Sequence, residues 1–409
     1  MKSKRRRARH TVGMAGHYTV RKVKIGRTEQ MDALARAAGD LYSQVVVWFW
    51  RTVRHKDLWL KARHLMRWLT SALLHAHSSD AVVQSFFAAL ASWHARRTSD
   101  PAAKPPHKRK RFYRVQWKAT AIRVREGYLH LANGRGHAPL IVPWRWDVPT
   151  QVEMGWDGRQ YELRATYCVE PLPPGKDGGV AGIDLGEVHL AVAHDGTHTT
   201  ILNGGIVRAV RRYQNKLQGK LDAGIDRQKK GSHRRRKTIR SKKKQLSKIA
   251  HQLKDALHKL TTKLVSTLHE RGVQTVVIGN IRDIRKNTDH GHTANQRLHQ
   301  MPSGLVRHMV TYKAQRLGMQ VVLVDERYTT QRCPACRRRY KPKGRLYRCR
   351  NKQCGFVFHR DGVGAINIRQ RYTASGPVVG AMASPTGVRY QARLPRSSAL
   401  CDRERIPRL

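Results

Sequence analysis

Acidic residues are scarce in this chain. The sequence has 27 Asp and Glu residues against 81 Lys and Arg residues, which gives a formal net charge of +54 over 409 residues. Self-repulsion among like charges opposes compaction, so this excess does not serve the stability of a folded domain. It indicates a large polyanionic partner, and nucleic acid is the interpretation we favour over a secreted cationic protein or a membrane-surface binder.

Long apolar runs are also missing. No stretch is long enough to span a bilayer, and the basic start Met1–Arg7 is not followed by an apolar signal core. We therefore expect a cytoplasmic protein without a membrane partner. Cysteine is rare as well: of 6 residues, four lie at metal-ligand spacing, while Cys168 and Cys401 stand alone. In a reducing compartment such a cluster binds metal more often than it forms disulfides.

The first half of the chain combines strand and helix patterns. Residues 1–16 form a basic arm, and His17–Ile25 alternates apolar and basic residues as a strand does. Residues 28–111 are helical up to about Arg97 and end in a basic, proline-containing linker, with Thr28 as a helix cap. Residues 112–172 return to a β pattern, with Asp157-Gly158 as a hairpin turn. These strands and the first one could form one small sheet or barrel, into which the helices are inserted.

Five tryptophans enrich the helical part: Trp48, Trp50, Trp59, Trp68 and Trp93. We favour core and interface packing for them over platforms on which bases stack.

The second half follows an α/β pattern. Strands are expected at Val180–Leu190, after the Asp195-Gly196 turn, at Thr275–Ile278 and at Val321–Val324. Residues 211–244 carry dense positive charge, which favours a phosphate-tracking helix or loop over a merely solvated face. Leucines from Leu246 to Leu268 then keep one apolar helical stripe. Residues 373–409 are rich in Gly, Pro, Ser and Arg, so we expect them to be mostly disordered.

The cysteine cluster has the spacing C-x2-C, twelve residues, C-x4-C, formed by Cys333, Cys336, Cys349 and Cys354. Two short cysteine loops can present four thiolates tetrahedrally, which suits one Zn²⁺ ion. Iron, disulfides or an inactive cluster are the alternatives. Four thiolates leave no open position for a reacting water, so we assign the zinc a structural role.

Two carboxylates lie next to apolar segments. Asp184 belongs to Gly182-Ile183-Asp184-Leu185-Gly186, where a lone buried acid would be costly unless it is paired or metal-bound. Asp361 follows the strand-like Phe356-Val357-Phe358 and opens a helix. For Asp361 alone, a helix N-cap is an equally good interpretation. Together with Asp184 and the cysteines, it favours a metal ligand.

These motifs resemble the TnpB family of RNA-guided, RuvC-type nucleases from insertion sequences, which are related to compact type V CRISPR effectors. The resemblance covers roughly residues 17–372. It is most specific in GIDLG, in YKAQRLGMQVVLVDERYTTQRCPAC and in CGFVFHRDGVGAINI. It implies a multidomain α+β and α/β protein of a prokaryotic host, acting at the nucleoid.

The resemblance also implies a domain layout. A β-barrel wedge domain would comprise residues 17–27 and 112–172, with a helical recognition domain and linker (28–111) inserted in it. An RNase H-like RuvC domain would comprise 176–330 and 358–372, with a zinc ribbon (331–357) inserted in it.

The chain departs from the family at one place. The middle RuvC strand usually ends in a catalytic Glu, but here it reads Val276-Val277-Ile278-Gly279-Asn280. Either cleavage is lost or another carboxylate has taken over. Glu326, at the end of the neighbouring strand, is our candidate. Adjacent Asp325 should point to the opposite face.

Other readings of these carboxylates remain open. Asp283 and Asp289 are weaker candidates for the second catalytic position. A surface ion pair is the alternative role for Glu326.

The family resemblance implies that Asp184, Glu326 and Asp361 hold two Mg²⁺ ions for phosphodiester hydrolysis. It also implies a guide RNA and double-stranded target DNA as partners, a short flanking motif read by the protein, and a monomer in the ribonucleoprotein. Basic residues in 1–12, 104–111 and 228–244 are expected to contact phosphates.

Three alternatives follow. The chain could be a nuclease-inactive RNA-guided DNA-binding repressor or a miniature type V CRISPR effector. A strand-joining transposase is disfavoured, because no tyrosine or serine recombinase signature is present.

Overall fold

The computed structural model describes residues 10–11, 17–107, 110–158, 160–173, 178–281, 289, 291–374 and 385–388. The chain forms two compact units: Gly16–Val169 is one, and Met1–Ala15 with Glu170–Leu409 is the other. Each unit has a hydrophobic core of its own. Most of the predicted basic arm and of the predicted disordered tail lies outside the described residues.

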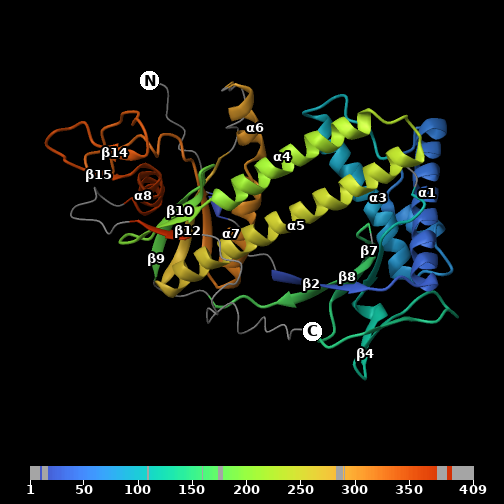
Figure 1. The fold of residues 1–409 in the computed structure, drawn as a ribbon. Helices are drawn as coiled ribbons and strands as arrows, with labels where there is room; N and C mark the ends of the chain where they lie inside the picture. Colours follow the sequence, from blue (N-terminus) through green and yellow to red (C-terminus); the bar gives the residue numbers. More distant parts are fainter. Residues whose placement is uncertain are drawn as a thin grey trace. The chain divides into compact units, whose positions relative to one another are not determined.

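The unit Gly16–Val169 begins with a strand, continues with three helices and returns to strands (Figure 1). Its elements in chain order are β2 (His17–Ile25), α1 (Glu29–Lys56), α2 (Ala62–Trp68), α3 (Ala76–Arg97), β3 (Val115–Lys118), a 3-10 turn (Ala119–Ala121), β4 (Ile122–Arg125), β5 (Tyr128–Leu131), β6 (Leu140–Pro143), β7 (Gln151–Trp156) and β8 (Tyr161–Val169). The predicted insertion of helices after the first strand is therefore confirmed. The cap is confirmed too, since Thr28 Oγ1 accepts a hydrogen bond from Met31 N at 3.3 Å.

The strands of this unit form two sheets, where the sequence predicted one. The first has the antiparallel order β2-β8-β7-β3, and the second has the order β4-β5-β6. The 3-10 turn Ala119–Ala121 separates β3 from β4 and carries the chain from one sheet to the next. The Asp157-Gly158 hairpin between β7 and β8 is confirmed.

The tryptophan prediction is only half right. Trp50 and Trp93 are partly buried against the core of this unit, as predicted. Trp48, Trp59 and Trp68 are instead 48%, 46% and 68% exposed. A helical pattern does not say which side of a helix is covered, and Trp59 lies in the connection between α1 and α2 rather than on a helix.

The other unit is built on a central sheet. Its described elements are β1 (His10–Thr11), β9 (Gly179–Asp184), β10 (His189–His194), β11 (Thr199–Asn203), α4 (Gly205–Asp226), α5 (His233–Glu270), β12 (Val273–Gly279), α6 (His292–Gln300), α7 (Ser303–Arg316), β13 (Gln320–Val324), β14 (Leu346–Arg348), β15 (Val357–His359), α8 (Arg360–Thr373) and β16 (Thr386–Val388). The strand order is β1-β13-β12-β9-β10-β11-β16. Strands β9, β12 and β13 run parallel, while β10 is antiparallel to both of its neighbours.

Helices cover both faces of this sheet. Val276 and Ile278 of β12 belong to the core that α5 and α7 complete, whereas Val277, which lies between them, packs with Ile368 of α8. This alternation follows from the two-residue period of a strand. Both faces are apolar, which explains why the parallel strands read as continuous hydrophobic runs.

Two predicted segments are divided in the structure. The strand expected at 180–190 is two strands, β9 and β10, because the chain turns at residues 185–188. Gly186 allows this turn, since a Cβ there would lie 2.8 Å from His189 O. The charged stretch at 211–244 spans the α4–α5 connection, and Figure 1 shows the two helices side by side.

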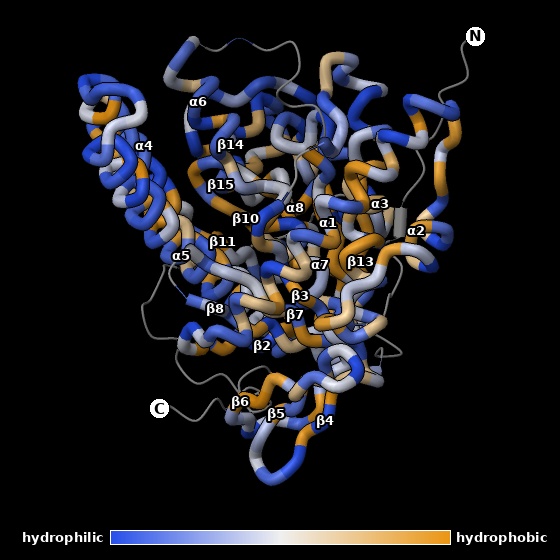
Figure 2. The backbone as a smooth tube through the Cα atoms, turned by 90° about the vertical axis from the view of Figure 1, so that its right-hand side faces the viewer, coloured by the Kyte–Doolittle hydropathy of each residue, from blue (hydrophilic) through white to orange (hydrophobic). Residues whose placement is uncertain are grey.

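Figure 2 shows α4 in largely hydrophilic colours. Within the described part of the chain, no helix combines the length and the apolar character that crossing a membrane requires.

Candidate functional site

Three parallel strands of the sheet end at the same edge. In β9 and β12 Ile183 lies opposite Ile278, and in β12 and β13 Gly279 lies opposite Val324. The next residue of β9 is Asp184, which therefore lies beside Gly279 at the carboxyl ends of the strands. In open α/β sheets this edge is where ligand sites form.

Asp184 faces α8. Gly182, two residues earlier and on the same face, packs so closely on this helix that a Cβ would lie 2.3 Å from Ala365 O. At Gly364 of α8, a Cβ would lie only 2.1 Å from Asp184 Oδ2. Burial raises the pKa of Asp184 well above its usual range, and the neighbouring carboxylates Glu326 and Asp361 raise it further. The structure thus brings the three predicted carboxylates into one site.

Glu326 fills the space beside Gly279. A Cβ built on Gly279 would lie 2.6 Å from Glu326 Oε2 and 3.1 Å from Glu326 Cβ. Gly279 shares the α8-facing side of β12 with Val277, so a longer side chain there would point to the place where Glu326 now lies. Glu326, which follows the neighbouring strand β13, therefore occupies the space that a side chain at position 279 would enter.

One oxygen of the Glu326 carboxylate lacks a hydrogen-bond partner among the described residues. This oxygen, Oε2, is buried. Burial raises the pKa of Glu326 to about 7, the charge of Asp325 acts in the same direction, and Arg371 opposes both. A buried oxygen without a partner is costly unless a ligand supplies the partner, and a divalent cation fits that need.

Asp361 lies in the first turn of α8, and the N-cap position belongs to His359. The alternative interpretation of Asp361 as the helix cap is therefore wrong. Its Oδ2 accepts hydrogen bonds from His189 Nδ1 at 2.7 Å and from Arg345 Nη1 at 3.0 Å.

Sequence reasoning missed the surroundings of Asp361. One ligand atom each of His189, His359 and Asp361 lies within 4.8 Å of the others, a spacing that could hold a metal ion. Burial lowers the pKa of His359, which favours its neutral form. The run His359-Arg360-Asp361 gave a partial signal for this cluster, but no pattern pointed to His189 on another strand.

The weaker candidates have other contacts. Asp289 Oδ1 accepts hydrogen bonds from Gly291 N at 2.9 Å and from Asn295 Nδ2 at 2.7 Å, which ties down the start of α6. Asp325 Oδ1 accepts a hydrogen bond from Arg327 N at 3.1 Å. Asp283 lies outside the described residues.

The four predicted cysteines converge. One sulfur atom from each lies within 4.8 Å of the others, and the Cys333–Cys354 and Cys336–Cys349 sulfur distances are 3.7 Å and 3.5 Å. The β14–β15 hairpin supports them with the buried side chain of Tyr347. Burial raises the pKa of Cys333 to about 12, so this thiol keeps its proton until a cation binds. An all-sulfur set of four ligands fits a structural zinc ion.

Comparisons with known proteins agree with this geometry. The family described as "Probable transposase" matches residues 161–285, and the family described as "Cas12f1-like, TNB domain" matches residues 304–368. A Streptomyces pristinaespiralis protein named as a candidate RNA-guided DNA endonuclease is 28% identical over 340 residues, which is 78% of this chain and 78% of that protein.

Further relatives match smaller portions. The TnpB-like protein ORF457 of Acidianus two-tailed virus is 30% identical over 59% of this chain and 52% of its own length. The CRISPR-associated endodeoxyribonuclease Cas12f1 of Sulfoacidibacillus thermotolerans is 26% identical over 51% of this chain and 50% of its own length. Among solved structures, the Cas12f1 chain in a complex with guide RNA and target DNA covers 83% of this chain and 81% of that chain, with a TM-score of 0.55 and 11% identity, a likeness of fold.

Proposed function

We propose that the chain is a TnpB-like protein and acts as an RNA-guided DNA endonuclease of an insertion sequence, which its similarity to the "Probable transposase" family model and to TnpB-like and RNA-guided endonuclease relatives supports. Its substrate would be DNA paired with a guide RNA beside a short flanking motif. Acting on chromosomal DNA would place it at the nucleoid in the cytoplasm of a prokaryotic host. The net charge of +54 supports partners as rich in phosphate as a guide RNA and a duplex.

We assign the nuclease domain to the unit that contains the central sheet. Its order β11-β10-β9-β12-β13, with three parallel strands, supports an RNase H-like RuvC domain into which the cysteine ribbon is inserted. In the unit Gly16–Val169 we assign the strands to the wedge domain and the inserted helices α1 to α3 to the recognition domain.

We assign Asp184, Glu326 and Asp361 as the ligands of two Mg²⁺ ions. Bound there, the ions would activate water and stabilise the leaving 3′ oxygen of the phosphodiester. The chain's own contribution is to hold three carboxylates at one strand edge: Asp184 against α8, Asp361 by His189, and Glu326 in the space beside Gly279. The position of Glu326 beside Gly279 carries the proposal, because Glu326 supplies there the carboxylate that the middle strand β12 lacks.

The test uses the ribonucleoprotein purified with RNA from its native locus and a target library. With Mg²⁺, the wild-type complex should cut targets that match the guide beside one short motif. Glu326→Gln should bind the target but reduce cleavage by roughly a thousandfold or more, since it removes a metal ligand. Asp325→Asn is the matched control, because it removes the adjacent carboxylate and should keep cleavage within about threefold of wild type.

The swap of the two positions is a sharper experiment. Glu326→Ala removes the carboxylate that lies 2.6 Å from a Cβ at position 279 and keeps its own Cβ at 3.1 Å, and adding Gly279→Glu returns a carboxylate from the middle strand. The double variant should recover part of the cleavage that Glu326→Ala loses.

Two outcomes would contradict the proposal. A wild-type complex that binds matched targets and never cuts them would make the chain a repressor that acts by occupancy, which the glycine at position 279 favours. Undiminished cleavage by Glu326→Gln would exclude this residue from the site.

A further inference from the structure

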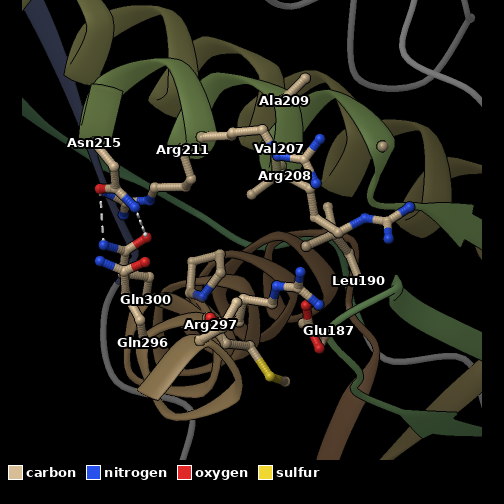
Figure 3. A pocket seen from close by; sticks show the side chains of 15 residues that line it. Glu187, Leu190, Val207, Arg208, Ala209, Arg211, Asn215, Gln296, Arg297 and Gln300 are labelled. Atoms are coloured by element: carbon tan, nitrogen blue, oxygen red, sulfur yellow. Dashed lines mark hydrogen bonds between the residues drawn. The ribbon is translucent and has the colours of Figure 1, made fainter. Parts of the chain in front are cut away.

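A cavity of about 500 Å³ lies in the same unit as the carboxylate site. Helix α4 forms one wall and α6 the other, and Glu187 and Leu190 from the β9–β10 turn and β10 close one end (Figure 3). Two side-chain amides join the walls: Asn215 Nδ2 donates to Gln300 Oε1 at 3.1 Å, and Gln300 Nε2 donates to Asn215 Oδ1 at 2.9 Å. This reciprocal pair fixes the distance between the two helices.

The lining is strongly positive. It includes four arginines and one carboxylate, Glu187, so its formal charge is 4 − 1 = +3. The arginines are Arg208, Arg211, Arg212 and Arg297. The first turn of α4, at Gly205 and Val207, adds the positive end of a helix of 22 residues.

Arg211 is half-buried, whereas the other three arginines are exposed. Its Nε is buried and has no hydrogen-bond partner among the described residues. Its Nη1 donates to the neutral Gln214 Oε1 at 3.0 Å, and burial lowers the pKa of Arg211. A buried guanidinium nitrogen without an acceptor is costly, and the planar fork of an arginine matches the oxygens of a phosphate.

We propose that this cavity binds a backbone phosphate of the target DNA strand at the carboxylate site, and that Arg211 holds that phosphate. The assignment to DNA rests on the proposed function and on position. Glu187 at the cavity's end lies three residues after Asp184, so the Cα atoms of these two residues are at most about 11 Å apart. A strand seated at the carboxylates would therefore place a neighbouring phosphate within reach of the arginines.

The experiment neutralises the phosphates one at a time. Target duplexes would carry a single methylphosphonate at successive positions around the cleavage site, and their affinities would be measured with ribonucleoprotein carrying Glu326→Gln, which should not cut. We expect one position to weaken binding by about three- to tenfold, the size of one charge-assisted contact. Adding Arg211→Gln should weaken binding of unmodified DNA by the same factor and abolish the sensitivity at that position.

Controls separate this contact from general charge and from folding. Lys220→Gln removes one positive charge from the same helix, nine residues along and on the opposite face, and should retain the sensitivity. Arg211→Lys should recover part of the affinity. Arg211→Gln should not lower the melting temperature, because it removes a half-buried charge whose Nε has no acceptor among the described residues; a merely structural arginine would lower it.

The proposal is overturned if Arg211→Gln binds DNA as tightly as its parent, or if it stays sensitive at the same positions. Sensitivity that appears only when the methylphosphonate is in the guide RNA would assign the site to RNA and overturn the DNA assignment. Because affinity is measured without cleavage, failure of the wild-type complex to cut would refute the proposed activity and leave this test intact.

Discussion

At the scale of single residues, the raised pKa of Glu326 predicts a pH effect on stability. Its pKa rises from 4.5 to about 7 in the folded protein, so the metal-free folded state binds more protons than the unfolded state between these values. The free energy of unfolding should therefore fall as pH rises through this window, by up to about 3 kcal/mol. Melting curves in chelator at about pH 5 and about pH 8 would test this expectation.

Glu326→Gln is the control for that measurement. Without the titrating group, the variant should lose less stability over the same pH range and should be more stable than wild type at the higher pH. Equal losses in both proteins would assign the pH effect to other groups. Mg²⁺ should stabilise wild type more at high pH, where the carboxylates are ionised.

The sequence predicts residue types better than it predicts their surroundings. Asp184 and Glu326 come together because each ends or follows an apolar strand of the central sheet, and the packing of α8 on that sheet brings Asp361 to them. The proximity of Glu326 to Gly279 could also be inferred, since parallel strands end at one edge. The contacts of His189 and Arg345 with Asp361 could not, because they depend on side-chain packing between distant segments.

At the scale of elements, the approach of α8 to the sheet depends on a missing side chain. Gly364→Ala would place a Cβ 2.1 Å from Asp184 Oδ2 and 3.1 Å from Thr330 Cγ2. The carboxylate must then move, and a displacement of about 1 Å should reduce cleavage about a hundredfold. Cleavage rates of the purified ribonucleoprotein measure this effect.

Gly219→Ala is the matched control on α4. No atom lies within 4 Å of the Cβ it would add, so the change should stabilise the helix by about 0.5–1 kcal/mol and leave cleavage unaltered. Wild-type cleavage by Gly364→Ala would mean that α8 can shift without disturbing Asp184.

The cysteine ribbon is a second element that can be tested by itself. Wild-type protein should contain one zinc per chain by metal analysis, and Cys349→Ser should lose it together with several kcal/mol of stability in the ribbon. Cys168→Ser changes an exposed cysteine outside the cluster and should retain both. Zinc retained in full by Cys349→Ser would place the metal elsewhere.

Element boundaries show where sequence patterns lose information. The strand β12 was placed correctly by its apolar run, because both of its faces are covered. The β9–β10 turn was missed, since Leu185, Val188 and Leu190 continue the apolar character through the bend. The end of α4 could not be located from the charged sequence, because lysines and arginines are equally compatible with a helix and with a connection between helices.

At the scale of the whole molecule, the charge predicts salt-dependent binding. Arg234, Lys237 and Lys244 are exposed on α5 at spacings that share one helical face. If each contacts a phosphate, changing all three to Gln should reduce the slope of log affinity against log salt by about 2 for single-stranded RNA. Filter binding at several salt concentrations measures the slope, and an unchanged slope would remove this face from the RNA-binding surface.

The order of helices and strands along the chain was predictable from the spacing of apolar residues. This spacing changes along each unit where strands give way to helices. The number of sheets in the unit Gly16–Val169 was not predictable, since the alternation of apolar and polar residues does not show which strands pair with each other.

The proposed exchange between positions 279 and 326 has a consequence for the evolution of such proteins. A carboxylate can migrate between strands during evolution, because one volume accepts a side chain from either backbone position. A lineage passing through such an exchange would carry both acids or neither for a time. Surveys that classify relatives by the middle strand alone would count active enzymes as inactive. A test for an acid at either position would distinguish active from inactive relatives.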